Sequence, residues 1–170
     1  MQKQVVYCKL IPRLFAMTID LVILSILITP IMNLISKHIF LLFFQDFFTL
    51  YSIDVNDAAA FSRATMSVEF TNYITAKQFL AYFSTLFLLN TTCMGFYFVF
   101  FWYKFNATPG KFLMKMKLVG ADNYTTPSIY QLIKRFISYA TVFPGLFLII
   151  FNAKKMALHD KLANTVVIKR

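Results

Sequence analysis

The sequence predicts an all-α membrane protein with two long transmembrane helices and a small two-stranded sheet on the cytoplasmic side. Hydrophobic residues make up 59% of the 170 positions and charged residues only 14%, with a mean hydropathy of +0.64. Soluble domains are about a quarter charged. Two apolar runs, residues 13–35 and 78–103, each exceed the roughly 20 residues that cross the bilayer core as a helix. The length indicates one membrane domain, residues 1–170.

The distribution of basic residues predicts the orientation. The net charge is +10, and lysines and arginines flank the apolar runs, as is typical of cytoplasmic segments. Lys3, Lys9 and Arg13 precede the first helix without an acidic residue, so we expect a cytoplasmic N-terminus and a multi-pass protein of the bacterial inner membrane. No basic module interleaved with aromatic residues is present in the sequence, and we therefore expect no nucleic-acid partner.

The first helix, residues 13–35, contains an aspartate about two turns from its start. A charge at this depth costs at least ~2.5 kcal/mol. Arg13 lies seven residues before Asp20, so both side chains are on one face of the helix. Burial favours a neutral carboxyl and a nearby cation favours a charged one. Asp20 is therefore either an intramembrane site for a proton or cation, or half of a structural ion pair with Arg13 or Arg135.

The first loop, residues 36–77, is predicted to lie outside the cell because it is slightly acidic. It contains Asp46, Asp54, Asp57 and Glu69. Its first part, residues 39–50, is rich in phenylalanine and leucine. We interpret this part as an amphipathic helix on the outer surface, and the alternative is an extension of the first helix. Residues 52–75 are predicted to form a surface loop.

The second helix, residues 78–103, has a polar belt in its middle, formed by Asn90, Thr91 and Thr92. Such residues mark either a helix–helix interface or the lining of a pathway. At ~1.5 Å of rise per residue, Tyr97 lies at the depth of Asp20, whereas Asn90 is about 10 Å further out. Tyr97 is therefore the predicted partner of Asp20 on the second helix.

Residues 104–135 form a basic segment that we place in the cytoplasm. Thr108 is predicted to cap a short helix in which Pro109 takes the first position. Its lysines, Lys111 among them, would lie over lipid phosphates. A strand at residues 117–119 is expected to pair with a second strand at residues 165–168. Ser128 is expected to cap the next helix.

The third apolar segment, residues 136–151, is short and is interrupted by Pro144-Gly145. A single span would place the basic tail, residues 152–170, outside the cell, against the usual charge rule. A re-entrant hairpin that turns at Pro144-Gly145 would keep the C-terminus in the cytoplasm and is tolerated when packed against other helices. We favour the hairpin, and a short third span is the alternative.

These blocks resemble the RDD family of small membrane proteins, which is named for one arginine and two aspartates. Arg13 and Asp20 match the arginine that begins the first helix and the aspartate in its middle. Further blocks match in order along most of the chain: Thr108-Pro109-Gly110-Lys111 after the second helix, Arg135 before the last apolar segment, and the run from His159 to Val167, which includes Asp160 and Thr165.

The resemblance also carries two departures and one functional implication. The family commonly has glycine where this chain has Lys115 and Asn164. Asparagine tolerates a left-handed backbone, which makes the second change mild. Cation/proton exchange is implied for some members of the family, and for this chain it is an implication of the resemblance alone.

Two hypotheses for function follow. The first is a small ion or solute transporter, which would need a homo-oligomer or a membrane-protein partner to enclose a path through the lipid bilayer. The second is a non-transporting scaffold or assembly factor that presents its basic cytoplasmic face. His159 and His38 are predicted on opposite sides of the membrane, so we expect no metal site. No motif of an enzyme or of a cofactor site is recognisable in the sequence.

Overall fold

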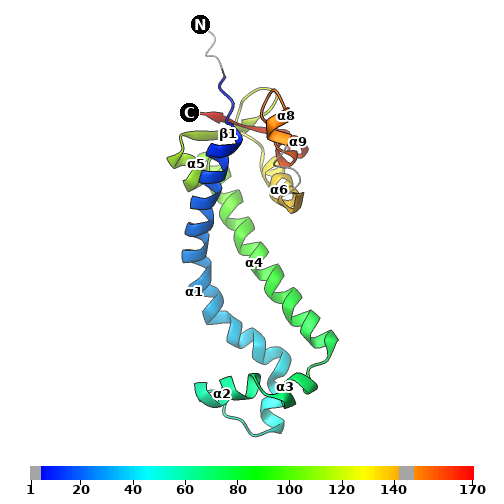
Figure 1. The fold of residues 1–170 in the computed structure, drawn as a ribbon. Coiled ribbons are helices and arrows are strands. Elements are labelled where there is room, and N and C mark those ends of the chain that lie inside the picture. Colours follow the sequence, from blue (N-terminus) through cyan, green and yellow to red (C-terminus); the bar gives the residue numbers. More distant parts are fainter. Residues whose placement is uncertain (1–4, 142–147) are drawn as a thin grey trace. The chain divides into compact units, whose positions relative to one another are not determined.

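The computed structural model describes residues 5–141 and 148–170. It divides into two compact units, a first unit of Met1–Ile26 and Cys93–Arg170 and a second unit of Leu27–Thr92. Figure 1 shows the helices and strands in chain order. The two longest helices, α1 (Leu10–Leu50) and α4 (Ala76–Phe105), each contribute residues to both units.

Both long helices have the length and composition of membrane spans. Large apolar side chains project from them into the surroundings, as with Phe15 at 60% exposure and Phe87 at 64%. Such extended apolar surface is rare on a soluble monomer. The predicted pair of long apolar helices is confirmed, and a membrane environment explains their exposed faces.

The structure shows that the amphipathic helix predicted over residues 39–50 was wrong as a separate element. α1 continues without interruption from Leu10 to Leu50, which is the extension considered as the alternative. Ser36, Lys37 and His38 separate the two apolar stretches, and none of them is a helix breaker. The phenylalanine-rich face that suggested a surface helix packs against protein instead.

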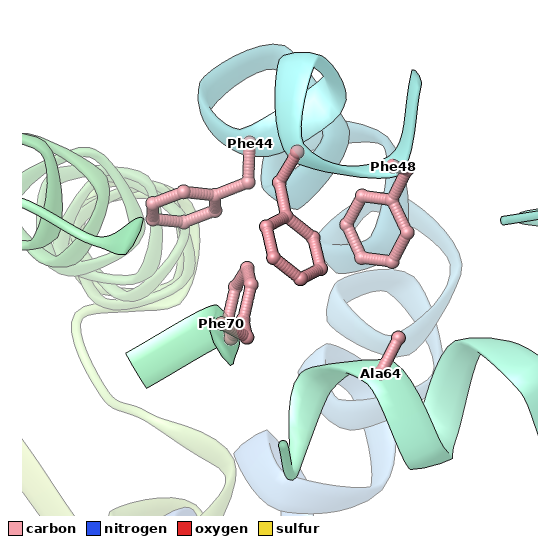
Figure 2. Close-up of a cluster of buried hydrophobic side chains, with 5 residues drawn as sticks. Phe44, Phe48, Ala64 and Phe70 are labelled. Atoms are coloured by element: carbon pink, nitrogen blue, oxygen red, sulfur yellow. The ribbon is translucent and has the colours of Figure 1, made fainter. Parts of the chain in front are cut away.

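The second unit also corrects the loop predicted over residues 52–75. Two helices form there, α2 (Ala58–Thr65) and α3 (Val68–Tyr73). The Asp57 and Ser67 side chains accept hydrogen bonds from the first backbone N–H groups of these helices and so act as N-caps. Their inner faces cover a hydrophobic cluster rich in phenylalanine, whose buried members are Phe44, Phe47, Phe48, Ala64 and Phe70. Figure 2 shows this cluster between α1, α2 and α3.

The predicted sheet of the first unit is confirmed. β1 (Met116–Gly120) and β2 (Thr165–Lys169) pair antiparallel, with Leu118 opposite Val167. The chain before α1 lies along the other edge of β2, where Cys8 N–H donates to the Val167 carbonyl at 3.1 Å. β2 is thus held on both sides, and the residues that enter α1 are fixed against it.

Figure 1 shows short helices on either side of this sheet. They are α5 (Pro109–Leu113), α6 (Ile129–Ile137), the 3-10 helix η1 (Ser138–Thr141), α8 (Leu148–Phe151) and α9 (Leu158–Leu162). Thr108 caps α5 and Ser128 caps α6, both as predicted. The turn predicted at Pro144-Gly145 lies outside the described residues, so the hairpin and the third span stay alternative predictions.

Two non-glycine residues of the first unit take left-handed backbone conformations at the positions where the resemblance expects glycine. The φ angle is 54° at Lys115 and 50° at Asn164. Lys115 lies between α5 and β1, and Asn164 lies between α9 and β2. The left-handed region costs an ordinary L-residue roughly 1–2 kcal/mol, and asparagine less than most. The left-handed backbone at Lys115 and Asn164 therefore explains why glycine is common at these two positions in the family.

Replacing Lys115 by glycine is expected to stabilise the protein. The removed backbone strain should exceed the greater freedom that glycine gains in the unfolded chain, for a net gain of up to about 1 kcal/mol. Thermal melting of the purified protein in detergent would measure the change. Lys117→Gly is the matched control because Lys117 lies inside β1, where glycine weakens a strand. Equal losses for both variants would contradict the prediction.

Candidate functional site

The first unit buries two aspartates, and each has its own set of donors. The Asp20 carboxylate, 2% exposed, accepts three hydrogen bonds, one from α4 and two from the start of α5. The donors are the Tyr97 hydroxyl at 3.2 Å, the Thr108 hydroxyl at 2.5 Å and the Gly110 backbone N–H at 2.8 Å. Asp20 thereby joins α1, α4 and the start of α5. The contact with Tyr97, expected from its depth in the second helix, is present.

Gly110 makes this arrangement sterically feasible. A Cβ atom on Gly110 would lie 2.1 Å from the carbonyl oxygen of Ala16 in α1 and 3.0 Å from the Asp20 carboxyl carbon. Only a residue without a side chain lets the backbone N–H come this close to the aspartate. Pro109, at the first position of α5, has no N–H group that would need a partner there.

The second aspartate is enclosed by two arginines. Asp160, which is fully buried, forms ion pairs with Arg13 and with Arg135, the latter at 2.5 Å. It also accepts a hydrogen bond from the Ala157 N–H at 2.9 Å. The predicted roles of Asp160, as the cap of a turn and as the partner of both arginines, are thus found together.

The two arginines also donate hydrogen bonds to other nearby acceptors. Arg13 donates to the Lys155 carbonyl at 2.7 Å and to the Cys8 carbonyl at 3.2 Å. Arg135 donates to the Thr165 hydroxyl at 2.6 Å. Because the donors and acceptors come from α1, α6, β2 and the chain around α9, this network joins segments that are far apart in the sequence.

The ionisation of this centre follows from its charges. Burial alone would raise the pKa of Asp160, but the charges of Arg135 and Arg13 hold it well below its usual range. Burial lowers the pKa of His159 to about 3, and the charge of Arg135 acts in the same direction. The centre therefore keeps a charged aspartate beside a neutral histidine throughout the physiological pH range.

Lys111 lies between the two carboxylates without pairing to either. Its side chain is 8% exposed, and its ammonium lies over the Trp102 ring at 5.3 Å from the ring centroid. In the part of the chain that the structure describes, no ion pair to Lys111 is found. Burial, with the charge of Arg135, lowers the pKa of Lys111 to about 7 despite the opposing effect of Asp20 and Asp160.

A cavity of about 100 Å³ adjoins both polar centres. Its polar lining comes from Arg13, Asp20, Lys111, Arg135, Tyr139 and His159, and its apolar lining from Met17, Leu21, Met94, Phe98 and Val167. The volume exceeds the roughly 10–15 Å³ that one water needs. A buried acid, a buried base and space for a small ligand therefore occur together in the first unit.

The structure brings together most of the predicted polar residues in the first unit, but the belt on the second helix belongs to the second unit. Asn90 donates to the Leu86 carbonyl at 3.0 Å and Thr92 to the Leu88 carbonyl at 2.7 Å, both within their own helix. Asn90, Thr91 and Thr92 belong to the second unit, whereas the cavity is lined by residues of the first unit. Among the described residues, none of the three belt residues is part of the cavity lining.

Two expectations for the charged residues were wrong. Asp20 makes no ion pair with Arg13 or Arg135 among the described residues, because both arginines pair with Asp160. Lys111 does not extend toward the surface but is buried over Trp102. Trp102 and Tyr139 were not anticipated as neighbours of the site. The only signal in the sequence was that Trp102 is the single tryptophan.

Together, the long apolar helices and the buried Arg–Asp–Arg centre define a small helical protein of the membrane type. The chain belongs to the RDD family, whose family model matches residues 7–164. An uncharacterized protein of Rickettsia prowazekii (strain Madrid E) is 37% identical over 172 residues, which cover 99% of this chain and 99% of the relative. No solved structure matches the chain significantly.

Replacing Asp160 by asparagine is expected to destabilise the protein strongly. The size of the side chain is retained, but the charges of Arg13 and Arg135 stay buried without their counter-ion, which typically costs about 3–5 kcal/mol. Thermal or denaturant unfolding in detergent would measure the loss. Asp46→Asn, at an exposed position of α1, is the control and should leave stability unchanged. Equal stability of both variants would argue against the network.

The stability of the wild-type protein is expected to rise with pH above neutrality because of Lys111. Its pKa is about 7 in the folded protein and 10.5 as a free side chain. Below pH 7 Lys111 is protonated in both the folded and the unfolded protein, so the folded protein bears the full cost of burying its charge. Between these values the unfolded chain binds more protons, so folding gains on the order of 1 kcal/mol per pH unit from this group.

Unfolding measured between pH 7 and pH 10 would test this slope. Lys111→Met removes the titrating group, so stability should depend less on pH in this range. The same variant should be more stable than the wild type at pH 7. Lys134→Met, at an exposed position of α6, is the matched control and should keep the wild-type slope. A slope that persists in Lys111→Met would show that another group causes it.

Proposed function

We propose that the protein is a membrane transporter for a small ion or solute and that its cargo binds in the cavity between Asp20 and Lys111. One observation carries the proposal: a buried acid and a buried base line the same cavity without pairing to each other. Stability alone would favour a closed pair or apolar residues at these positions. Unpaired charges around a cavity are typical of sites that bind and release charged species.

Proton coupling is the second part of the proposal. A lysine whose pKa is about 7 gains or loses its proton at little cost near neutral pH. Asp20 faces the same cavity, so its charge and that of Lys111 would act together on a bound cargo through space. Binding of a charged cargo and protonation of Lys111 would then influence each other, which is the requirement for coupled transport.

The proposed assembly is an oligomer. Two helices that could span a membrane do not enclose a path, so a second copy or another membrane protein would supply the remaining wall. We further propose a multi-pass arrangement with both termini in the cytoplasm, which follows the distribution of lysine and arginine. The proposed activity is passage of a cargo, and it needs no catalysed reaction.

Wild-type protein in proteoliposomes is expected to support proton-coupled flux, and Asp20→Asn and Lys111→Met are expected to lose it. Asparagine keeps the size of Asp20 but removes its charge, and methionine does the same for Lys111. The measurement is a pH-sensitive dye inside the vesicles during pulses of Na⁺, Li⁺, K⁺ or chloride. Asp46→Asn should retain the wild-type flux because its side chain is exposed and distant in sequence from the cavity residues of α1.

Folding of each variant would be checked by gel filtration and circular dichroism before reconstitution. Equal background flux in wild type and in all variants would overturn the transport proposal. The non-transporting scaffold would then be the better reading, because the buried network of Arg13, Asp160 and Arg135 would serve to hold the basic segments in a fixed arrangement for a partner.

A further inference from the structure

We propose that the cavity beside Lys111 is a binding site for one small monovalent anion of halide size. The inference rests on the proposed function in that it concerns the same cavity and names the class of its ligand.

The charges around the cavity leave one cation without a counter-ion. Arg13, Lys111 and Arg135 line the cavity, and both arginines pair with Asp160. The Asp20 carboxylate is already engaged by three neutral donors. Protonated Lys111 therefore remains in a buried position without an ion pair in the described part of the chain. A buried charge of this kind calls for a partner of opposite sign.

An unused donor points to the same sign of ligand. Within the described residues, the buried Arg135 Nε–H has no hydrogen-bond partner, and Arg135 lines the cavity with Lys111. Arg135 is 1% exposed, so bulk water does not compensate for the missing acceptor. An anion brings acceptor capacity to this donor. A metal cation would bring none, and it would meet a net positive charge because Arg13, Lys111 and Arg135 outnumber the Asp20 and Asp160 carboxylates beside them.

The dimensions and the apolar wall restrict the anion. The cavity measures about 100 Å³, and Met17, Leu21, Met94 and Phe98 form one part of its lining. A halide with a water or two fits this volume. Divalent sulfate or phosphate would lose more hydration than one lysine can replace, because the cost of removing a charge from water rises steeply with that charge.

Binding should be linked to a proton on Lys111. The groups that face Lys111 come from every element around it: Arg13 and Asp20 in α1, Trp102 in α4, Arg135 in α6, Tyr139 in η1, and His159 and Asp160 in α9. Asp160 and Arg135 keep their charges across neutral pH. Lys111 loses its charge as the pH rises above neutrality, so anion affinity should fall over the same range.

The single tryptophan provides the readout. Trp102 is fully buried, and both the Lys111 ammonium and the Arg135 guanidinium lie 5.3 Å from its ring. Iodide quenches indole fluorescence on contact. Sodium iodide titrated into the protein in detergent, at constant ionic strength with sodium gluconate, should therefore give saturable quenching that chloride reverses. Between pH 6 and pH 8 the apparent dissociation constant should rise about tenfold.

Two variants separate the site from general quenching. Lys111→Met should lose the saturable phase, and Lys134→Met should retain it. Exchange of sodium for potassium should change nothing. Quenching that stays linear in iodide, or that chloride does not reverse, would overturn the anion site. Should Lys111→Met fail to fold, chloride competition and the pH dependence of the wild type decide the question by themselves.

The binding and flux experiments can fail independently. Saturable, chloride-sensitive quenching without flux would support the anion site and overturn transport. Proton-coupled cation flux together with linear quenching would support transport and overturn the anion site.

Discussion

The first unit depends on one carboxylate, Asp160, held between Arg13 and Arg135 away from water. Removing three charges from solvent is costly, and the attraction among them offsets that cost only if every remaining donor and acceptor is used. The structure supplies most of these partners from main-chain groups, among them the Lys155 carbonyl, and from the Thr165 hydroxyl, and among the described residues it leaves Arg135 Nε without one. The partners come from the start of α1, from α6, from β2 and from the chain around α9, so the network fixes where those segments meet.

Because Asp160 engages both arginines, Asp20 must be stabilised by other means. Its donors are uncharged, and they come from α4 and from the turn that begins α5. The two aspartates thus differ in kind although both are buried. One is locked in a network of permanent charges, and the other faces a cavity beside a lysine whose charge can change. Only the arrangement around Asp20 has a neighbouring charge, that of Lys111, that can change when a proton binds or leaves.

Features that depend on local chemistry could be predicted from the sequence more fully than features that depend on packing. The caps at Thr108 and Ser128, the pairing of β1 with β2 and the depth match of Tyr97 with Asp20 follow from rules that act over a few residues or along one axis. The merged helix α1 and the burial of Lys111 did not follow. A phenylalanine face has the same pattern whether lipid or protein covers it, and a lysine beside apolar residues has the same pattern at a surface or over a buried indole.

The four consecutive residues Thr108-Pro109-Gly110-Lys111 form one structural unit at the start of α5. Thr108 caps α5 and also donates to Asp20. Pro109 begins the helix without an N–H to satisfy, and Gly110 lets the backbone touch α1. The same helical turn then carries the Lys111 side chain to the cavity. The same short stretch therefore contacts the Asp20 carboxylate and carries the Lys111 side chain, so the position of the base relative to the acid is set by four consecutive residues. Under the proposed function, this fixed geometry would allow the charge on one group to influence a ligand at the other.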